Sequence, residues 1–404
     1  MTLDAFHLKC EYQKCVIAQL RSPKETFLYR YFPDDVTEVV YTQLMVRHVS
    51  ANILEGIGIG LQKRVNISTS PKVQRVKLTA KCNIYHLGIE RTGLREIEFE
   101  ENDKLKELII VSSSLKSVPP SLRLLKNLQK VHIVRSLIQH LDLGLFCGHA
   151  NLMIINFNRN RIHSIRNSKR ECYTIIEATI HVEENFISCL DLELFDIFEN
   201  KNELYLGGNQ IALLSQKLTS ETLNKFDLHD NRLLSLDICE WKTPSIKLLD
   251  LRTNLLTSLP QCVENLKNLE MLWLSSNRIT SVTIESFATM WSLRDLSLDE
   301  NNMTAIVLNS AHFPPQLQSL HITSNLLTSL NLSSIPVRDL NIVVTHNLIA
   351  DFDVNGTSSN VTRLVMACNP IDCSWNSAME KESAICTRDQ EVLFVKRGCE
   401  WEYK

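Results

Sequence analysis

The feature that most constrains the fold is a pattern of apolar residues around an asparagine, which recurs along most of the chain. Leu272 and Leu274 precede Asn277 and Ile279 follows it, in the pattern LxxLxLxxNxIxxV. In the other registers, the place of Asn277 is taken by Thr92, Ser113, Ser136, Asn160, Asn185, Asn209, Asn231, Asn254, Asn301, Asn325, Asn347 and Asn369. These thirteen registers lie 21 to 25 residues apart. Self-similarity at such a period is typical of stacked repeats.

Each position of the repeat has a physical role. In LxL, two apolar side chains point inward and the residue between them points outward, as in a β-strand. The asparagine, in what we call the ladder position, can both donate and accept hydrogen bonds where the chain leaves the strand. Strands of neighbouring repeats lie about 4.8 Å apart while the return segments are bulkier. The stack therefore curves, with the strands on its concave side.

The pattern predicts an α/β repeat solenoid, a curved leucine-rich-repeat horseshoe of about 13 repeats with a parallel sheet on its concave face. Residues 1–72 lack the repeat frame and are expected to form an N-terminal cap in which Cys10 and Cys15 are disulfide candidates. Residues 73–370 carry the repeats, and residues 371–404 are expected to form a cysteine-rich C-terminal cap. Cys368, Cys373, Cys386 and Cys399 are expected to form two disulfides there, with the pairing open.

The interior cysteines allow two interpretations. Cys239 and Cys262 each lie eight residues past a ladder asparagine, so a disulfide across neighbouring repeats is one interpretation and a small buried hydrophobe is the other. Cys147 and Cys172 form a similar but looser pair. Cys82 and Cys189 have no evident partner.

Cysteines and sequons favour an extracellular protein. Glycosylation is predicted at Asn66, Asn331, Asn355 and Asn360, whereas Asn302, beside a ladder asparagine, is expected to be too buried. The cysteine clusters near both ends of the chain also favour an oxidising, extracellular setting. The first residues contain charge throughout and no apolar core of a signal peptide, so we expect a leader to be missing from this sequence.

The bulk properties exclude several other classes of protein. The net charge is −3 with no block of like charge, which gives no support to nucleic-acid or membrane-surface binding. No apolar stretch reaches the roughly 18 residues of a membrane-spanning helix. The motifs of common enzymes and zinc sites are absent from the sequence, so we predict a protein that is not an enzyme and that has no cofactor or metal.

Outward positions on the strands are the candidate site for a partner. Aromatic residues and arginine are the usual anchors of interfaces, and an outward tryptophan or tyrosine on a concave surface favours binding. The predicted partner-binding residues are His181, Tyr205, Asp227, His229, Asp250, Arg252, Trp273 and His321. A metal site formed by Asp227, His229 and Asp250 is one alternative. We favour a solvated charge cluster that is paired internally with Arg252.

The opening segment LKCEYQKCVIAQL and the closing CNPIDC resemble those of insect secreted repeat proteins, which include the mosquito leucine-rich immune proteins. The resemblance implies a circulating protein that pairs with another leucine-rich-repeat protein and holds complement-like proteins. Long members carry a coiled coil after the repeats. This chain ends at Lys404 without one, as expected of a short form or a truncated chain.

These features favour a secreted recognition or adaptor protein of innate immunity that binds a protein or glycan through its concave face. The ectodomain of a cell-surface or matrix adhesion receptor is the main alternative. An intracellular scaffold is a third alternative, which the cysteine caps oppose.

Overall fold

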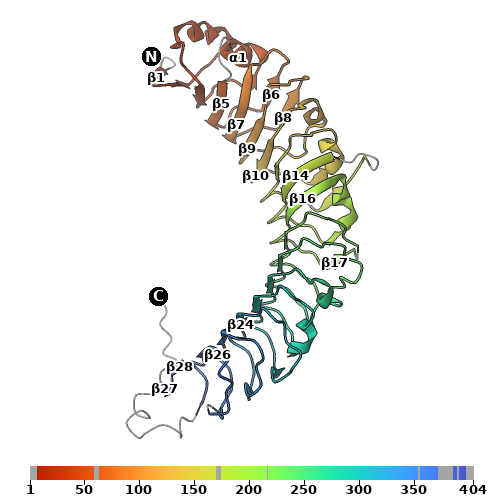
Figure 1. Ribbon diagram of the computed structural model, residues 1–404. Helices are drawn as coiled ribbons and strands as arrows, with labels where there is room; N and C mark the ends of the chain where they lie inside the picture. Colours follow the sequence, from red (N-terminus) through yellow and green to blue (C-terminus); the bar gives the residue numbers. More distant parts are fainter. Residues whose placement is uncertain are drawn as a thin grey trace. The chain divides into compact units, whose positions relative to one another are not determined.

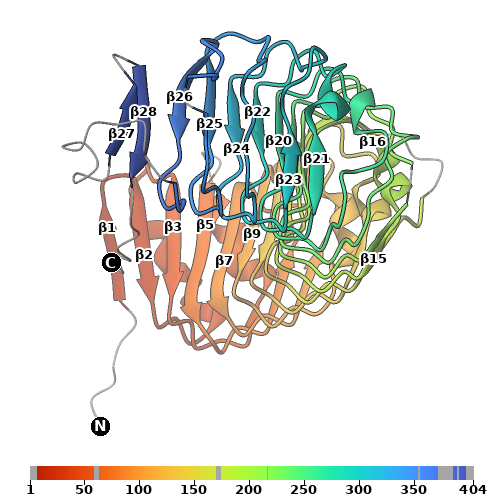
Figure 2. The same ribbon diagram turned by 90° about the horizontal axis from the view of Figure 1, so that it is seen from below.

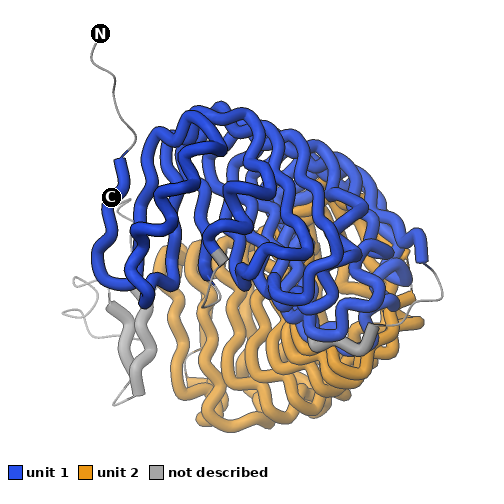
Figure 3. The backbone as a smooth tube through the Cα atoms, turned by 90° about the horizontal axis from the view of Figure 1, so that it is seen from above, with its two compact units in different colours: residues 1–209 blue, residues 210–404 orange. Residues whose placement is uncertain are grey.

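The computed structural model describes residues 7–58, 63–169, 174–215, 217–353, 355–371, 385–388 and 391–396. By its internal contacts the chain divides into unit 1, Met1–Asn209, and unit 2, Gln210–Lys404 (Figure 3). Cys172, Cys373 and Cys399 lie outside the described residues, as does the side chain of Cys386.

Unit 1 is built on a parallel sheet that begins with one antiparallel hairpin. Its strands are β1 (His7–Glu11), β2 (Lys14–Ala18), β3 (Glu38–Thr42), β5 (Lys63–Ser70), β7 (Ile84–Thr92), β9 (Glu107–Val111), β10 (Lys130–Val134), β12 (Ile154–Asn156), β14 (Thr174–His181) and β16 (Phe198–Tyr205). β1 pairs antiparallel with β2, and each later strand pairs in parallel with the one before it in this series. Figure 2 shows β1 to β9 of this series side by side.

Unit 2 continues the same construction with shorter strands. These are β18 (Lys225–Asp227), β19 (Leu248–Asp250), β20 (Met271–Trp273), β22 (Asp295–Ser297), β24 (Ser319–His321), β25 (Leu340–Val343), β26 (Val361–Val365), β27 (Ile385–Arg388) and β28 (Glu391–Lys396). Each strand from β18 to β26 pairs in parallel with the next one in this series. β26 pairs in parallel with β28, which pairs antiparallel with β27.

The return segments carry short elements on the other side of each sheet (Figure 1). In unit 1 these are the 3₁₀ turns η1 (Pro23–Tyr31), η2 (Gly56–Gly58), η3 (Pro120–Leu124), η4 (Leu143–Phe146) and η5 (Leu192–Ile197), the helix α1 (Ala51–Glu55), and the strands β4 (His48–Val49), β6 (Arg75–Leu78), β8 (Glu96–Phe99), β11 (His140–Asp142), β13 (Ser164–Arg166) and β15 (Cys189–Leu190). In unit 2 they are β17 (Leu213–Leu214), η6 (Val263–Asn265), β21 (Ser281–Thr283), η7 (Ile284–Phe287) and β23 (Ala305–Val307). Among the described residues, no helix has the length and apolar character needed to span a membrane.

The core of each unit lies between the sheet and its return segments. The inward residues of the strands and of the turns that follow them, such as Leu272 of β20 and Leu274 just after it, are completely buried. Their outward neighbours form what we call the open face of the sheet, the surface that the sequence predicts to be concave. The repeat pattern thus buries one face of the sheet and leaves the other available for binding.

Ladder asparagines bond to the backbone of their own repeat and of the preceding one. The Asn277 Oδ1 accepts a hydrogen bond from the Leu256 N–H at 3.0 Å, and its Nδ2 donates to the Leu251 carbonyl at 2.9 Å and the Leu274 carbonyl at 3.0 Å. The residue before each ladder position has a positive φ, from Gln19 to Cys368. This recurring turn leaves backbone groups that the asparagine amide satisfies.

The ladder begins earlier than the sequence predicts. β2, β3 and β5 lie within residues 1–72, the predicted cap, yet they pair in parallel as repeat strands. Their ladder positions are Leu20, Leu44 and Ser70, each preceded by a residue with positive φ. The predicted boundary between the cap and the repeats at residue 72 is therefore wrong. Three repeats, which we also call rungs, precede the thirteen that the sequence pattern identifies. An apolar residue at the first two ladder positions conceals the repeat.

Disulfides join two pairs of the candidate cysteines. Cys10 and Cys15 bridge β1 and β2 at directly paired positions, and Cys239 bonds to Cys262 of the next rung. Cys147 and Cys368 are also disulfide-bonded. The free cysteines among the described residues are the buried Cys82, whose thiol pKa is raised by burial, and the exposed Cys189.

Candidate functional site

A chain of polar and aromatic contacts runs across the open face of unit 2. Arg252 donates to both carboxylate oxygens of Asp250, at 2.6 to 3.1 Å, and its guanidinium lies 4.6 Å from the centroid of the Trp273 ring. The Trp273 Nε1 donates to Asp295 Oδ1 at 3.2 Å. Asp250 and Trp273 occupy paired outward positions of β19 and β20. Hydrogen bonds and a cation–π contact therefore hold the tryptophan on the open face.

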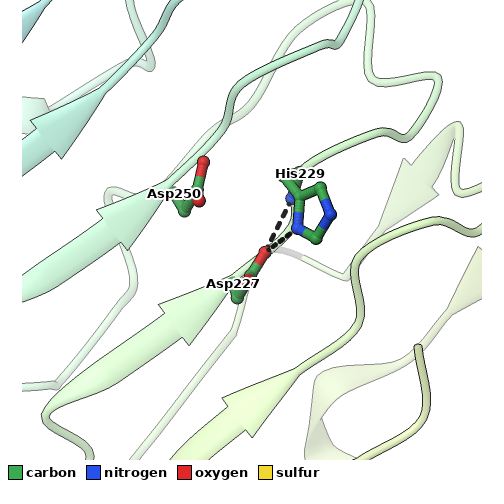
Figure 4. Close-up of side chains that lie close together, drawn as sticks. All are labelled: Asp227, His229 and Asp250. Atoms are coloured by element: carbon green, nitrogen blue, oxygen red, sulfur yellow. Dashed lines mark hydrogen bonds and ion pairs between the residues drawn. The ribbon is translucent and has the colours of Figure 1, made fainter. Parts of the chain in front are cut away.

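Asp227 and His229 form a second pair on the strand before (Figure 4). The His229 Nδ1 lies 2.6 Å from Asp227 Oδ1, and the backbone N–H of His229 donates to the same oxygen at 3.0 Å. The hydrogen bond to Asp227 raises the pKa of His229, although burial opposes the shift. Burial acts to raise the pKa of Asp227, but the hydrogen bonds from His229 outweigh it and lower the pKa. Both shifts favour the ion pair of imidazolium and carboxylate.

Asp227 and Asp250 are the carboxylates of a cluster of ion pairs, and both are buried. The ligand atoms of Asp227, His229 and Asp250 lie within 4.8 Å of one another, close enough to suggest a metal site. However, Arg252 already binds both oxygens of Asp250, and His229 binds Asp227. The internal pairing with Arg252 is confirmed, but the expectation of a solvated cluster is wrong, because Asp250 is only 1% exposed and Asp227 only 7%. His229 and Arg252 fold back over their own strands and cover the two carboxylates.

A concavity of about 550 Å³ adjoins this cluster within unit 2. It is lined by His229, Arg252, Thr253, Trp273, Ser275, Ser276, Asp295, Ser297, Asp299, Glu300 and His321. Four predicted site residues, His229, Arg252, Trp273 and His321, are thus brought to one surface. Asp227 and Asp250 do not line it and act through the side chains that they bind.

The sequence-based site missed three acidic residues of this concavity, Asp295, Asp299 and Glu300. Asp295 lies before the first inward residue of β22, and Glu300 is the positive-φ residue before Asn301. Glu300 lies in the turn after the strand, so strand alternation does not predict its position. The repeat frame could have identified Asp295 and Asp299, because they alternate with the inward residues Leu296 and Leu298.

The remaining predicted residues, His181 and Tyr205, are brought together on the open face of unit 1. They occupy paired positions of β14 and β16, and their rings stack with centroids 4.4 Å apart and planes 6° apart. The His181 Nδ1 lies 3.0 Å from Glu183 Oε2, and the Tyr205 hydroxyl donates to Glu203 at 2.8 Å. Unit 1 therefore carries a rigid aromatic pair that is bordered by carboxylates.

The sequons differ in their surroundings. Asn331 and Asn355 are exposed, while Asn360 is half-buried and donates to the Ile335 carbonyl at 2.7 Å. Asn66 is half-buried in β5, and its Nδ2 donates to Glu38 at 3.1 Å. Asn302 is exposed, so the expectation that it is too buried for modification is wrong. Its backbone turns away from the core immediately after Asn301.

Comparisons with known proteins agree with the fold. A family model described as "Leucine rich repeat" matches residues 267–327. The crystal structure of an LRIM1/APL1C complex is similar over 99% of this chain and 69% of that chain, with a TM-score of 0.64 and 15% identity. The APL1 leucine-rich repeat domain is similar over 97% of this chain and 96% of that chain, with a TM-score of 0.54 and 15% identity.

A third similar structure is also a complex by its description. The Toll–Spatzle complex, described as a hub in Drosophila development and innate immunity, is similar over 90% of this chain and 62% of that chain, with a TM-score of 0.51 and 16% identity. No curated protein matches the chain in sequence. At these identities the likeness concerns the fold. By its fold, the chain is a leucine-rich-repeat solenoid similar to the LRIM1/APL1C and APL1 structures.

Proposed function

We propose that this chain is a secreted recognition protein that binds a protein partner through the open face of its sheet, in innate immunity. The observation that carries the proposal is Trp273, a large aromatic side chain on the open face that is fixed between Arg252 and Asp295 beside a concavity. An aromatic anchor held in one orientation loses little entropy on binding, and tryptophan and arginine are enriched among the residues that dominate interfaces.

The related folds support a protein as the partner. Two of the similar structures are complexes by their description, LRIM1/APL1C and Toll–Spatzle, and the latter is described as a hub of innate immunity. Leucine-rich-repeat folds typically serve as scaffolds for protein interactions, so we propose a binding rather than a catalytic role. The open face offers hydrogen-bonding groups around an aromatic anchor, which is the usual composition of an interface core and its rim.

The disulfides support an extracellular location. Cys10–Cys15 and Cys239–Cys262 are bonded in the structure, and such bonds persist in oxidising compartments. Asn302, Asn331 and Asn355 are exposed sequon asparagines, which suits a glycoprotein that passes through the secretory route.

Replacing Trp273 or Tyr205 with alanine is expected to weaken binding of the natural partner at least about tenfold, because each change removes an aromatic anchor. The partner would be captured from cell-free extracellular fluid with the tagged chain, identified by mass spectrometry, and titrated against each variant. The melting temperature should change little, because both side chains are only half-buried on the open face.

The matched control is Trp291→Ala, which removes a tryptophan that is 57% exposed in a return segment. This variant should bind like the unmodified chain. Equal affinity of the Trp273, Tyr205 and Trp291 variants would contradict the proposal that the open face makes the contact.

A further inference from the structure

In the part of the chain that the structure describes, three carboxylates in the concavity of unit 2 accept hydrogen bonds from neutral donors only. Asp295 accepts a hydrogen bond from the Trp273 indole at 3.2 Å. Asp299 accepts from the Ser297 hydroxyl at 3.0 Å and from the Thr323 backbone N–H at 2.7 Å. Glu300 accepts from the Ser276 hydroxyl at 2.7 Å. Neutral donors orient a carboxylate but leave its negative charge uncompensated.

The cations that line the concavity are already paired. Arg252 is bound to Asp250, and His229 is bound to Asp227. In the part of the chain that the structure describes, Asp295, Asp299 and Glu300 form no ion pair with a lysine, arginine or histidine. The concavity therefore carries an excess of negative charge, and a recess with walls of low dielectric constant concentrates the field of such charge.

The spacing of these carboxylates indicates the shape of the cation. Among the described residues, the side chains close enough to share a metal ion are those of Asp227, His229 and Asp250. Asp295, Asp299 and Glu300 do not belong to such a group. They are spread over the concavity and do not converge on a point. A guanidinium has five N–H donors in a planar fork and can bind one carboxylate through two of them, so the arginines of one segment can bind separate carboxylates that a single metal ion cannot join.

Trp273 adds an apolar wall for such a group. Its ring already faces one guanidinium, that of Arg252, at 4.6 Å, so the local field and geometry accept an arginine beside the indole. The methylene stem of an incoming arginine would pack on the remaining apolar surface while its charged end reaches the carboxylates.

We propose that this concavity binds arginine side chains of a basic segment of the protein partner, with the carboxylates of Asp295, Asp299 and Glu300 as their partners beside Trp273. The inference rests on the proposed function and deepens it, because it specifies which chemical group of the partner is recognised. It assigns the partner a basic segment that contacts β20, β22 and the turn after β22.

The test is a calorimetric titration of the full chain with a synthetic peptide of alternating glycine and arginine. The variant Asp295→Asn/Asp299→Asn/Glu300→Gln keeps hydrogen-bond acceptors of the same shape but removes three charges. We expect it to bind the arginine peptide at least about tenfold more weakly than the unmodified chain. The same peptide with citrulline in place of arginine should not bind, because citrulline is neutral.

The control variant Glu221→Gln/Glu240→Gln/Glu264→Gln removes the same number of charges from exposed positions in the return segments. It should bind the arginine peptide like the unmodified chain, and both variants should keep its melting temperature. Equal weakening in the two variants would overturn the pocket, because binding would then follow net charge. Absence of binding to the unmodified chain at low salt would also overturn it. Equal affinity for a lysine peptide would overturn the preference for guanidinium.

Failure of this inference can be distinguished from failure of the proposed function. If the triple pocket variant binds the natural partner as tightly as the unmodified chain does, the arginine pocket is not what the partner uses, while the open-face proposal stands. If the alanine variants of Trp273 and Tyr205 leave partner binding unchanged but the pocket variant loses the peptide, the proposed function fails while the pocket itself stands.

Discussion

Replacing Leu274 with aspartate is expected to unfold unit 2. Leu274 is completely buried between the sheet and the return segments. Removing a leucine side chain from a packed core costs about 2–5 kcal/mol, and a carboxylate without a partner adds a further desolvation cost. The sum is comparable to the whole stability of a typical domain, which is roughly 5–15 kcal/mol. Circular dichroism should show loss of cooperative unfolding at room temperature and poor recovery of soluble protein.

Leu348→Asp is the matched control. It makes the same chemical change at a leucine that is 52% exposed. This variant should fold and melt within a few degrees of the unmodified chain, because its carboxylate remains in water. If Leu274→Asp melted like Leu348→Asp, the assignment of the LxL positions to a buried core would be contradicted.

Replacing Asn277 with alanine is expected to cost about 2–4 kcal/mol of unfolding free energy. The change removes the acceptor of the Leu256 N–H and the donor to the Leu251 and Leu274 carbonyls. Leaving a buried backbone group without a partner costs about 1–3 kcal/mol, and at least two groups are affected. Denaturant unfolding followed by circular dichroism would measure the loss.

Asn268→Ala removes the same side chain from an exposed position. Its amide donates one hydrogen bond, to the Pro244 carbonyl at 2.8 Å. Water can replace this bond, so we expect a loss below about 1 kcal/mol. Equal losses for the two variants would mean that the ladder position contributes no more to stability than a surface amide does.

The sequence predicts the repeat fold most completely where the apolar frame and a polar ladder residue occur together. From Thr92 onward, the inward apolar residues and the ladder residue together define each rung, and the structure places the strands accordingly. The first rungs escape detection because Leu20 and Leu44 stand where later rungs carry asparagine. There the backbone turn is formed without a side-chain amide, and only the positive φ of Gln19 and Gln43 reveals the frame.

The candidate site was predicted less completely than the fold. The strand period places Trp273, Arg252 and Tyr205 on the open face, because outward positions follow from alternation alone. Alternation does not reveal how side chains bend back along their own strand, so the burial of Asp250 beneath Arg252 was missed. Glu300 was missed for a related reason, since its position depends on the turn after the strand.

The central claim is that the open face contacts a protein partner, and site-directed photo-crosslinking tests it most directly. p-Benzoylphenylalanine would be placed at position 275, where Ser275 lines the concavity of the open face, or at position 291 in a return segment, and each tagged protein would be irradiated in cell-free extracellular fluid. We predict a covalent adduct with a protein from position 275 and none from position 291, resolved on a denaturing gel and identified by mass spectrometry. An adduct from position 291 without one from position 275 would contradict the account.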